Sequence, residues 1–207
     1  SISSETVSTD GYDITAERIP NIADNVDNWD THTGKWTTWS SSTEDTNNLT
    51  SPYVRTSGIG ISDLTKTLTY MPEGQYKLTA NVYAYYNSSW TTRKVQELFL
   101  NDKTLTINSA RNRTATLREI SGSVAADNKL EFGLKITSSS SATNTAMDNV
   151  KLVYQGTKAE YIEGIEAINY KMTNEAKSLV GKLMNASVAN NLNAVVGAAD
   201  NALSSYT

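Results

Sequence analysis

The sequence has little of several residues that chemistry and cross-linking depend on. Its 207 residues include no cysteine, one histidine, three prolines and two phenylalanines. Without cysteine there is no disulfide framework and no thiolate site. No apolar run approaches the roughly 18 residues of a membrane span. Charged residues make up 19%, the net charge is −4 and no basic run occurs, which argues against a nucleic-acid partner.

Because charged residues are few, the polar part of the sequence consists mainly of hydroxyl, amide and polar aromatic side chains. Ser, Thr and Asn are abundant, and eleven Tyr and four Trp outnumber the two Phe. Tyr and Trp join an apolar body to a polar tip, so they suit wet binding surfaces as well as cores. This composition favours an extracellular or cell-surface location. No signal peptide is visible at Ser1, as expected for a mature chain and equally for a cytosolic one.

The hydrophobic period changes near residue 157. Before it, apolar residues alternate in short runs that polar turns separate, which is typical of strands; after it, they recur every three or four residues, which is typical of helices. We therefore predict a β-sandwich over residues 1–156 and a helical segment over residues 157–207. The fold class is mainly β: an antiparallel β-sandwich of jelly-roll type with a C-terminal α-helical hairpin.

The clearest predicted strand runs from Gln75 to Tyr86, directly after the turn residues Pro72-Glu73-Gly74. Its alternation directs Leu78 and Val82 to the core and Tyr83 and Tyr85 to the other face. Further strands are predicted near Ile14 and at residues 65–70, 95–100, 117–124, 130–136 and 150–154.

The helical segment is predicted to form two helices. One apolar stripe includes Tyr161, Ile168 and Leu183, and a second includes Val188 and Leu203. Asn185-Ala186-Ser187 lies between the stripes and is the predicted break, with Asn185 or Ser187 as the N-cap. Two helices alone leave an apolar groove, so we expect a truncated helical bundle whose remainder follows Thr207.

An ordered set of short motifs resembles a known family. They are Tyr12-Asp13-Ile14-Thr15 followed by Asn21 and Trp29, then the turn and strand over 68–78, then residues 98–101, and finally the closing strand Met147-Asp148-Asn149-Val150-Lys151-Leu152-Val153-Tyr154. Together they resemble the galactose-binding-like jelly-roll modules of Bacteroidetes surface and secreted proteins, over roughly residues 12–155. The resemblance implies a carbohydrate-binding module, often an accessory to glycan-degrading enzymes. Fold alone does not give function.

Sugar binding needs an aromatic ring against the pyranose face and polar groups for the hydroxyls. Trp90 lies in a polar loop with Arg93, Tyr83 and Tyr85 lie on an outward strand face, and Trp39 lies in a predicted loop. These five residues are the predicted ligand-binding set. Arg55 is a further candidate donor, although a solvated role is the commoner one for such a residue. Trp29 and Trp36 are instead expected to close the ends of the core.

Catalytic and metal-binding patterns are sparse. His32 is the one histidine and is expected to be solvated, no nucleophile or phosphate-loop motif occurs, and no facing pair of carboxylates is indicated, so we do not expect an enzyme. Asp24, Asp27 and Asp30 recur in one loop, which fits either a solvated loop or oxygen ligands for calcium. The resemblance adds a structural calcium near Asp148; the alternative role of Asp148 is to hydrogen-bond the last turn.

The sequence thus predicts a non-catalytic module of a secreted or cell-surface bacterial protein. Its expected partner is a glycan or polysaccharide, and it binds without changing the sugar. The alternative is a structural spacer or adhesive protein-interaction module, for which the apolar helical segment is the motivating feature. The sequence leaves the sugar and the oligomeric state open.

Overall fold

The structure is a computed structural model that describes residues 11–46, 48–56, 60–86, 95–137 and 144–204. The chain divides into two compact units, Ser1–Ile165 and Glu166–Thr207. The first unit contains every strand and the first two turns of the long helix, and the second contains the remainder of that helix.

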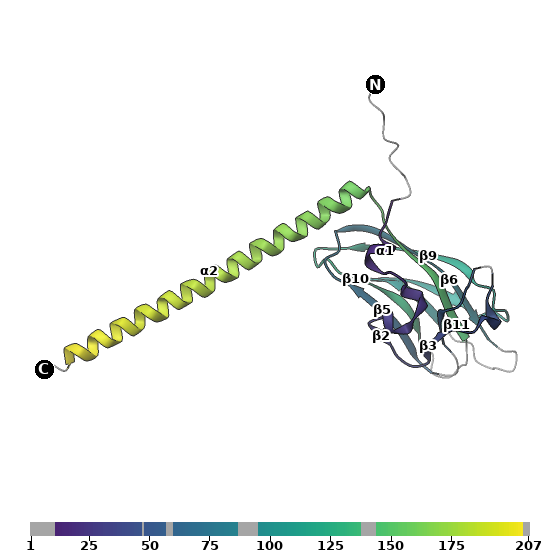
Figure 1. The fold of residues 1–207 in the computed structure, drawn as a ribbon, viewed down its shortest axis with the longest axis horizontal. Helices are drawn as coiled ribbons and strands as arrows, with labels where there is room; N and C mark the ends of the chain where they lie inside the picture. The colour runs from purple at the N-terminus through teal and green to yellow at the C-terminus, as the bar shows by residue number, and fades with distance from the viewer. Residues whose placement is uncertain (1–10, 47, 57–59, 87–94, 138–143, 205–207) are drawn as a thin grey trace, which may run out of the picture. The chain divides into compact units, whose positions relative to one another are not determined.

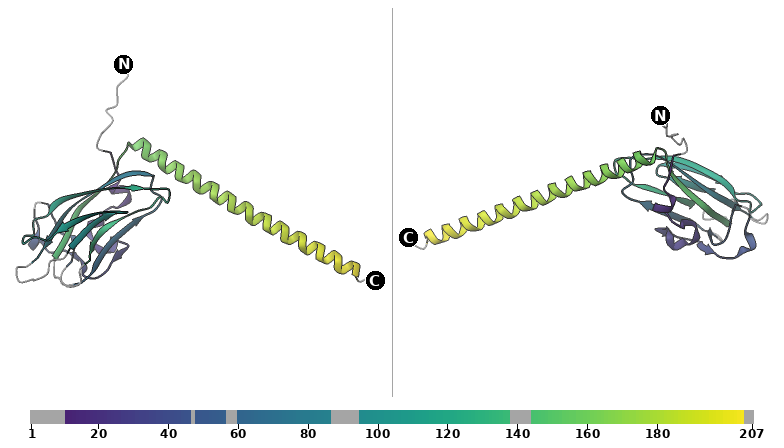
Figure 2. Two further views of the ribbon diagram at one scale, coloured as in Figure 1. Left: turned by 180° about the vertical axis from the view of Figure 1, so that it is seen from behind. Right: turned by 45° about the horizontal axis from the view of Figure 1, so that its top comes forward.

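Two antiparallel sheets face each other in the first unit (Figure 1, Figure 2). The first sheet has the order β3-β4-β11-β6-β9, and β1 pairs with β11. Its strands are β1 (Tyr12–Asp13), β3 (Trp36–Trp39), β4 (Tyr53–Thr56), β6 (Gly74–Tyr85), β9 (Thr116–Val124) and β11 (Asn144–Tyr154). The second sheet has the order β2-β5-β10-β7-β8. Its strands are β2 (Thr31–His32), β5 (Ser62–Leu68), β7 (Val95–Leu100), β8 (Lys103–Asn108) and β10 (Leu130–Ile136).

The predicted antiparallel sandwich is confirmed. Short helical segments follow β1: α1 (Thr15–Arg18), η1 (Ile22–Asp24) and η2 (Val26–Asn28), with η3 (Ser42–Glu44) after β3. The sequence reading missed β2, β3, β4 and β8. The first three have only two to four residues each, too few to establish a period, and β8 carries only two apolar residues, Leu105 and Ile107.

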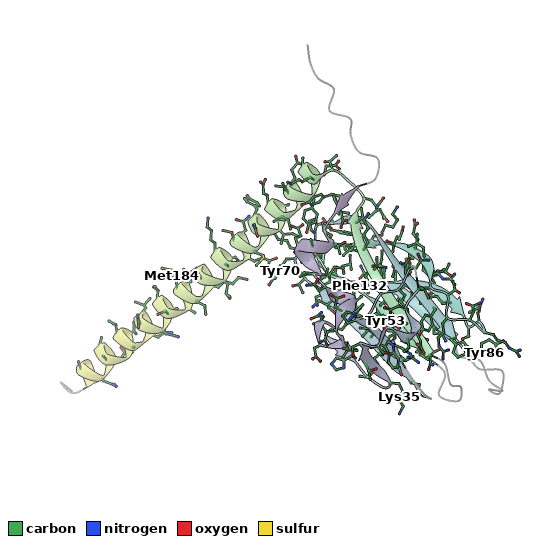
Figure 3. The ribbon with its side chains drawn as sticks, turned by 45° about the vertical axis from the view of Figure 1, so that its right-hand side comes forward. Lys35, Tyr53, Tyr70, Tyr86, Phe132 and Met184 are labelled. Carbon is green, nitrogen blue, oxygen red and sulfur yellow. The ribbon has the colours of Figure 1, made fainter. Side chains whose placement is uncertain are left out.

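The long strand β6 shows why the predicted alternation held. Gly74 begins it at a φ of +139°, and the preceding Pro72 carbonyl accepts the Tyr76 hydroxyl at 2.6 Å. Leu78 and Val82 then point into the core, which they share with Phe132 of β10. Figure 3 shows Phe132 among the strands. Full burial of such side chains is worth about 1.5–3 kcal/mol each.

Both early tryptophans are core residues, as predicted. Trp29 and Trp36 are each 4% exposed. The Trp29 ring meets Phe132 edge-on at 5.5 Å between centroids, and its Nε1 donates to the carbonyl of Ile22 at 2.8 Å. A buried indole N–H with an acceptor adds no desolvation penalty, so the entry segment is fixed against the core.

The predicted helical hairpin is wrong, because a single helix, α2, runs from Lys158 to Ser204. Asn185-Ala186-Ser187 contains neither glycine nor proline, and Asn and Ser cost only a fraction of a kcal/mol each inside a helix. What changes there is the apolar stripe. At about 100° per residue, Val188 and Leu192 lie roughly opposite Leu179 and Leu183 around the axis. The sequence reading took this change of face for a break.

Side chains extend from all sides of α2, with Met184 near its middle (Figure 3). The change from strand to helix falls between Tyr154 and Lys158, where the hydrophobic period changes. No helix in the described part of the chain is both long and apolar enough to cross a membrane.

Candidate functional site

The outward face of the first sheet brings together three of the five predicted ligand-binding residues. Arg55 of β4 pairs with Ala146 of β11, which pairs with Tyr83 of β6, so these side chains form one row across three strands. Trp39 pairs with Tyr53 in the neighbouring row. A small apolar cluster, separate from the main core, is built here from Leu49, Tyr53, Tyr83, Ala115 and Ala146, with Trp39 and Tyr85 packed against it.

Glu44, the last residue of η3, lies at the centre of this face. Its Oε2 accepts a hydrogen bond from the Tyr83 hydroxyl at 2.9 Å and is 2.8 Å from Nη1 of Arg55. Its Oε1 is 3.2 Å from Nε of Arg113. The neighbouring Asp45 accepts the backbone N–H and the hydroxyl of Ser51, each at 3.1 Å. These contacts hold the segment after β3 on the sheet.

Each arginine also covers an aromatic ring. The Arg55 guanidinium lies 3.9 Å from the ring centroid of Trp39, and that of Arg113 lies 3.9 Å from the ring centroid of Tyr85. We call Trp39, Glu44, Arg55, Tyr85 and Arg113 the ring–arginine cluster. Cation–π contact and a shared carboxylate both restrict the two guanidinium groups, so the cluster presents ordered donors beside two rings.

Exposure differs sharply across the ring–arginine cluster. The side chain of Arg55 is 6% exposed, that of Glu44 is 17% exposed and that of Arg113 is 37% exposed. Trp39 and Tyr85 are half-buried. Solvent, and hence a ligand, meets Arg113 and the accessible parts of the two rings, while Arg55 lies beneath.

The predicted exposure of Tyr83 is wrong. Tyr83 is 2% exposed, although it lies on the outward face as predicted, because the segment that contains Glu44 and Leu49 covers it. Burial, together with the hydrogen bond to Glu44, raises the pKa of Tyr83. Burial also raises the pKa of Tyr53 to about 12, with a contribution from the charge of Glu44. Tyr83 therefore positions Glu44 and offers no ring face to a ligand.

Trp90 and Arg93 lie outside the described residues. Arg55, expected to be solvated more often than not, is instead buried against Trp39 and Glu44. The sequence reading missed Glu44 and Arg113 entirely, since neither belongs to a motif. One signal was present around Arg113: residues 103–118 contain four basic side chains and no acidic one, within a chain of net charge −4.

The three candidate metal ligands do not come together. Asp24 and Asp148 line one hollow of about 140 Å³ with Asn21 and Asn149. Asp27 does not line this hollow; it is exposed and lies 3.7 Å from His32. Within the described ranges, no group of three His, Cys, Asp or Glu side chains is placed to hold a metal.

Asp148 makes the hydrogen bonds expected of its alternative role. Its carboxylate accepts the backbone N–H of Thr50 at 2.9 Å and that of Asn149 at 2.8 Å. Burial raises the pKa of this carboxyl, the two N–H groups oppose the shift and the charge of Asp24 adds to it. Calcium takes six to eight oxygen ligands, whereas both carboxylate oxygens of Asp148 already accept backbone N–H groups, which is the hydrogen-bonding role.

Comparison with known proteins adds little to this geometry. No family model matches the chain, and no curated protein matches it. Several solved structures are similar at low identity. TmCBM61 in complex with β-1,4-galactotriose is 9% identical, with 60% of this chain and 86% of that chain covered and a TM-score of 0.45.

Two family 35 carbohydrate-binding modules are also similar. The module from Clostridium thermocellum is 12% identical, with 63% of this chain and 95% of that chain covered and a TM-score of 0.42. The module from Paenibacillus barcinonensis is 14% identical, with 59% and 91% covered and a TM-score of 0.38. With TM-scores below 0.5, these likenesses assign neither a family nor a ligand to this chain.

Proposed function

We propose that the sandwich is a non-catalytic carbohydrate-binding module that holds glycan on the outward face of its first sheet. The observation that supports this proposal is the ring–arginine cluster. Two half-buried aromatic rings, Trp39 and Tyr85, flank a carboxylate and two guanidinium groups that already fix one another. Rings cover the apolar face of a pyranose, and charged groups hydrogen-bond its hydroxyls.

The order of the cluster before any ligand arrives supports binding. Glu44 is held by Arg55, Arg113 and the Tyr83 hydroxyl, so little side-chain entropy is left to lose on association. The accessible area is small, however, and shallow sites of this kind bind weakly, with Kd of about 10–1000 μM. The sequence adds Trp90 and Arg93 as further proposed ligand contacts.

No catalytic role is part of this proposal. His32 lies on the surface with Asp27 beside it, as the solvated role predicts. Glu44 lies between two arginines, and its carboxylate is an acceptor that suits hydroxyl hydrogen bonds. We further propose a secreted or cell-surface location for the protein, as its composition suggested, with the sandwich as its glycan-binding domain.

A glycan array with the purified chain tests the proposed function. We expect binding to a defined glycan that Trp39→Ala and Tyr85→Ala each weaken at least tenfold. Tyr170→Ala is the matched control, because Tyr170 is 72% exposed on α2 and Ala is the best helix former. Folding of each variant is checked by its far-ultraviolet circular dichroism. If the control and both cluster variants bind the glycan equally well, the binding site does not lie on this face.

A second candidate function, a protein-interaction or spacer module, rests on α2. Exposed apolar side chains continue along the helix: Leu179, Val180, Leu183, Met184, Val188, Leu192, Val195 and Val196. Exposed apolar area on this scale is typical of interaction surfaces. Because the stripe changes face near Asn185, one straight partner helix covers only half of it. Sedimentation of the chain at concentrations from roughly 1 to roughly 100 μM measures its mass and so tests self-association.

A further inference from the structure

The ring–arginine cluster has more positive than negative charge. Two guanidinium groups share the single carboxylate of Glu44, with Arg55 at 2.8 Å and Arg113 at 3.2 Å. Arg55 is buried, so its charge is matched by Glu44 at close range. The excess charge therefore lies with Arg113, which is the more exposed of the two at 37%.

Arg111 adds a second exposed guanidinium two residues before Arg113. The other basic residues of 103–118 lie elsewhere: Lys103 is in the second sheet, and Arg118 pairs with Ala80, a core residue. The Arg111 guanidinium lies 5.7 Å from the ring centroid of Tyr86, next in sequence to Tyr85. Local charge of one sign attracts an oppositely charged ligand even when the whole chain, here at −4, repels it at longer range.

We propose that the site takes a glycan with a carboxylate group, a uronate, and that Arg113, held over the Tyr85 ring, pairs with this carboxylate. The inference rests on the proposed glycan-binding function and names its ligand class. A guanidinium presents parallel N–H donors that match the two oxygens of a planar carboxylate. The Arg113 nitrogen nearest Glu44 is Nε, and its terminal nitrogens are the ones that we assign to the ligand.

The role of Arg55 follows from its burial. Its contacts with Glu44 and the Trp39 ring fix the carboxylate that in turn orients Arg113. Arg55 is thus a positioning residue, and Arg113 is the residue that contacts the ligand. A neutral sugar has no group that pairs with a guanidinium. Discrimination between charged and neutral glycans therefore depends on the carboxylate of the ligand.

The experiment uses the full chain and three uronate polysaccharides: polygalacturonate, alginate and hyaluronan. Each is presented with its own methyl ester, which keeps the sugar skeleton and removes the charge. We expect the chain to bind at least one polymer about tenfold or more tightly than its ester, the scale of one charge-assisted pair. Raising the salt concentration should weaken binding of the acid and leave that of the ester unchanged.

Variants locate the effect. Arg113→Gln should bring the ratio of acid to ester affinity close to one, and Arg113→Lys, which keeps the charge but loses the paired donors, should give an intermediate ratio. Lys103→Gln removes one positive charge from the same basic segment but lies outside the cluster, so it should change the ratio less than about twofold. Circular dichroism confirms that each variant is folded.

The outcomes separate the inference from the function on which it rests. Equal binding of each acid and its ester, or binding only to neutral or sulfated glycans on the glycan array described above, would overturn the ligand class while the glycan-binding function stood. An unchanged ratio in Arg113→Gln would overturn the role of Arg113. No binding to any glycan would overturn the proposed function together with the inference.

Discussion

Removing the Glu44 carboxylate should destabilise the sandwich strongly, because it leaves Arg55 buried without its counter-charge. The Arg55 side chain is 6% exposed, and its Nη1 is 2.8 Å from Glu44. Breaking a buried ion pair from one side costs about 3–5 kcal/mol. Part of the Arg55 charge still faces the Trp39 ring at 3.9 Å, a contact worth about 1 kcal/mol. We therefore expect Glu44→Ala to lower the free energy of unfolding by about 2–4 kcal/mol.

Urea unfolding followed by tryptophan fluorescence measures this loss, since all four tryptophans precede residue 157 and report on the sandwich. Glu44→Gln keeps an acceptor for the Tyr83 hydroxyl and for Arg55, so it should cost about half as much. The double variant Glu44→Ala with Arg55→Met removes the orphaned charge and should recover stability relative to Glu44→Ala alone.

Two results would refute this reasoning. One is a loss below about 0.5 kcal/mol for Glu44→Ala, which is the size of an exposed ion pair. The other is strict additivity: the free energy lost in the double variant equals the sum of the losses in Glu44→Ala and Arg55→Met measured separately. Additivity of this kind means that the two side chains do not interact.

Three further predictions concern the core and titrating groups. Phe132→Ala should lower the free energy of unfolding by about 3–5 kcal/mol in urea titrations, because Phe132 is fully buried between the sheets. The free energy of unfolding should fall as pH rises above 10. The folded pKa of Tyr53 is raised to about 12 and those of Tyr76 and Tyr83 are raised as well, so the unfolded chain loses these protons first. A urea midpoint that stays constant from pH 8 to 11 would contradict this. Because the pKa of Asp148 is raised, the contribution of this group to stability falls as pH rises from 3.8 through its folded pKa. Asp148→Asn should remove that part of the pH dependence. An identical pH profile of the thermal midpoint in both proteins would refute this prediction.

The residues of the binding face show where sequence reasoning succeeded. Alternation along β6 placed Tyr83 and Tyr85 on the outward face because strand geometry is a local property of the chain. The same local rule placed Leu78 and Val82 in the core and predicted the paired sheets. Whether an outward residue is exposed is not local. Tyr83 is buried by Leu49 and by the segment of Glu44, more than thirty residues away in sequence.

The long helix gives the complementary lesson. Periodicity predicted helical structure after residue 157, and α2 confirms it. The same periodicity could not distinguish a break from a stripe that moves around the axis near Asn185. Only continuous backbone hydrogen bonding decides between them, and none of the three residues at Asn185–Ser187 interrupts it.

What the sequence determined by itself is therefore the local part of this protein: strand faces, turns at Pro72 and Gly74, a core with Trp29 and Trp36, and helix after residue 157. The tertiary structure alone decided the ring–arginine cluster. Glu44, Arg55 and Arg113 come from η3, β4 and the segment before β9, and they form a site only because the strand order β4-β11-β6-β9 brings those segments to one face. Charge pairs act over a few ångströms in space, and no spacing along the chain records that proximity.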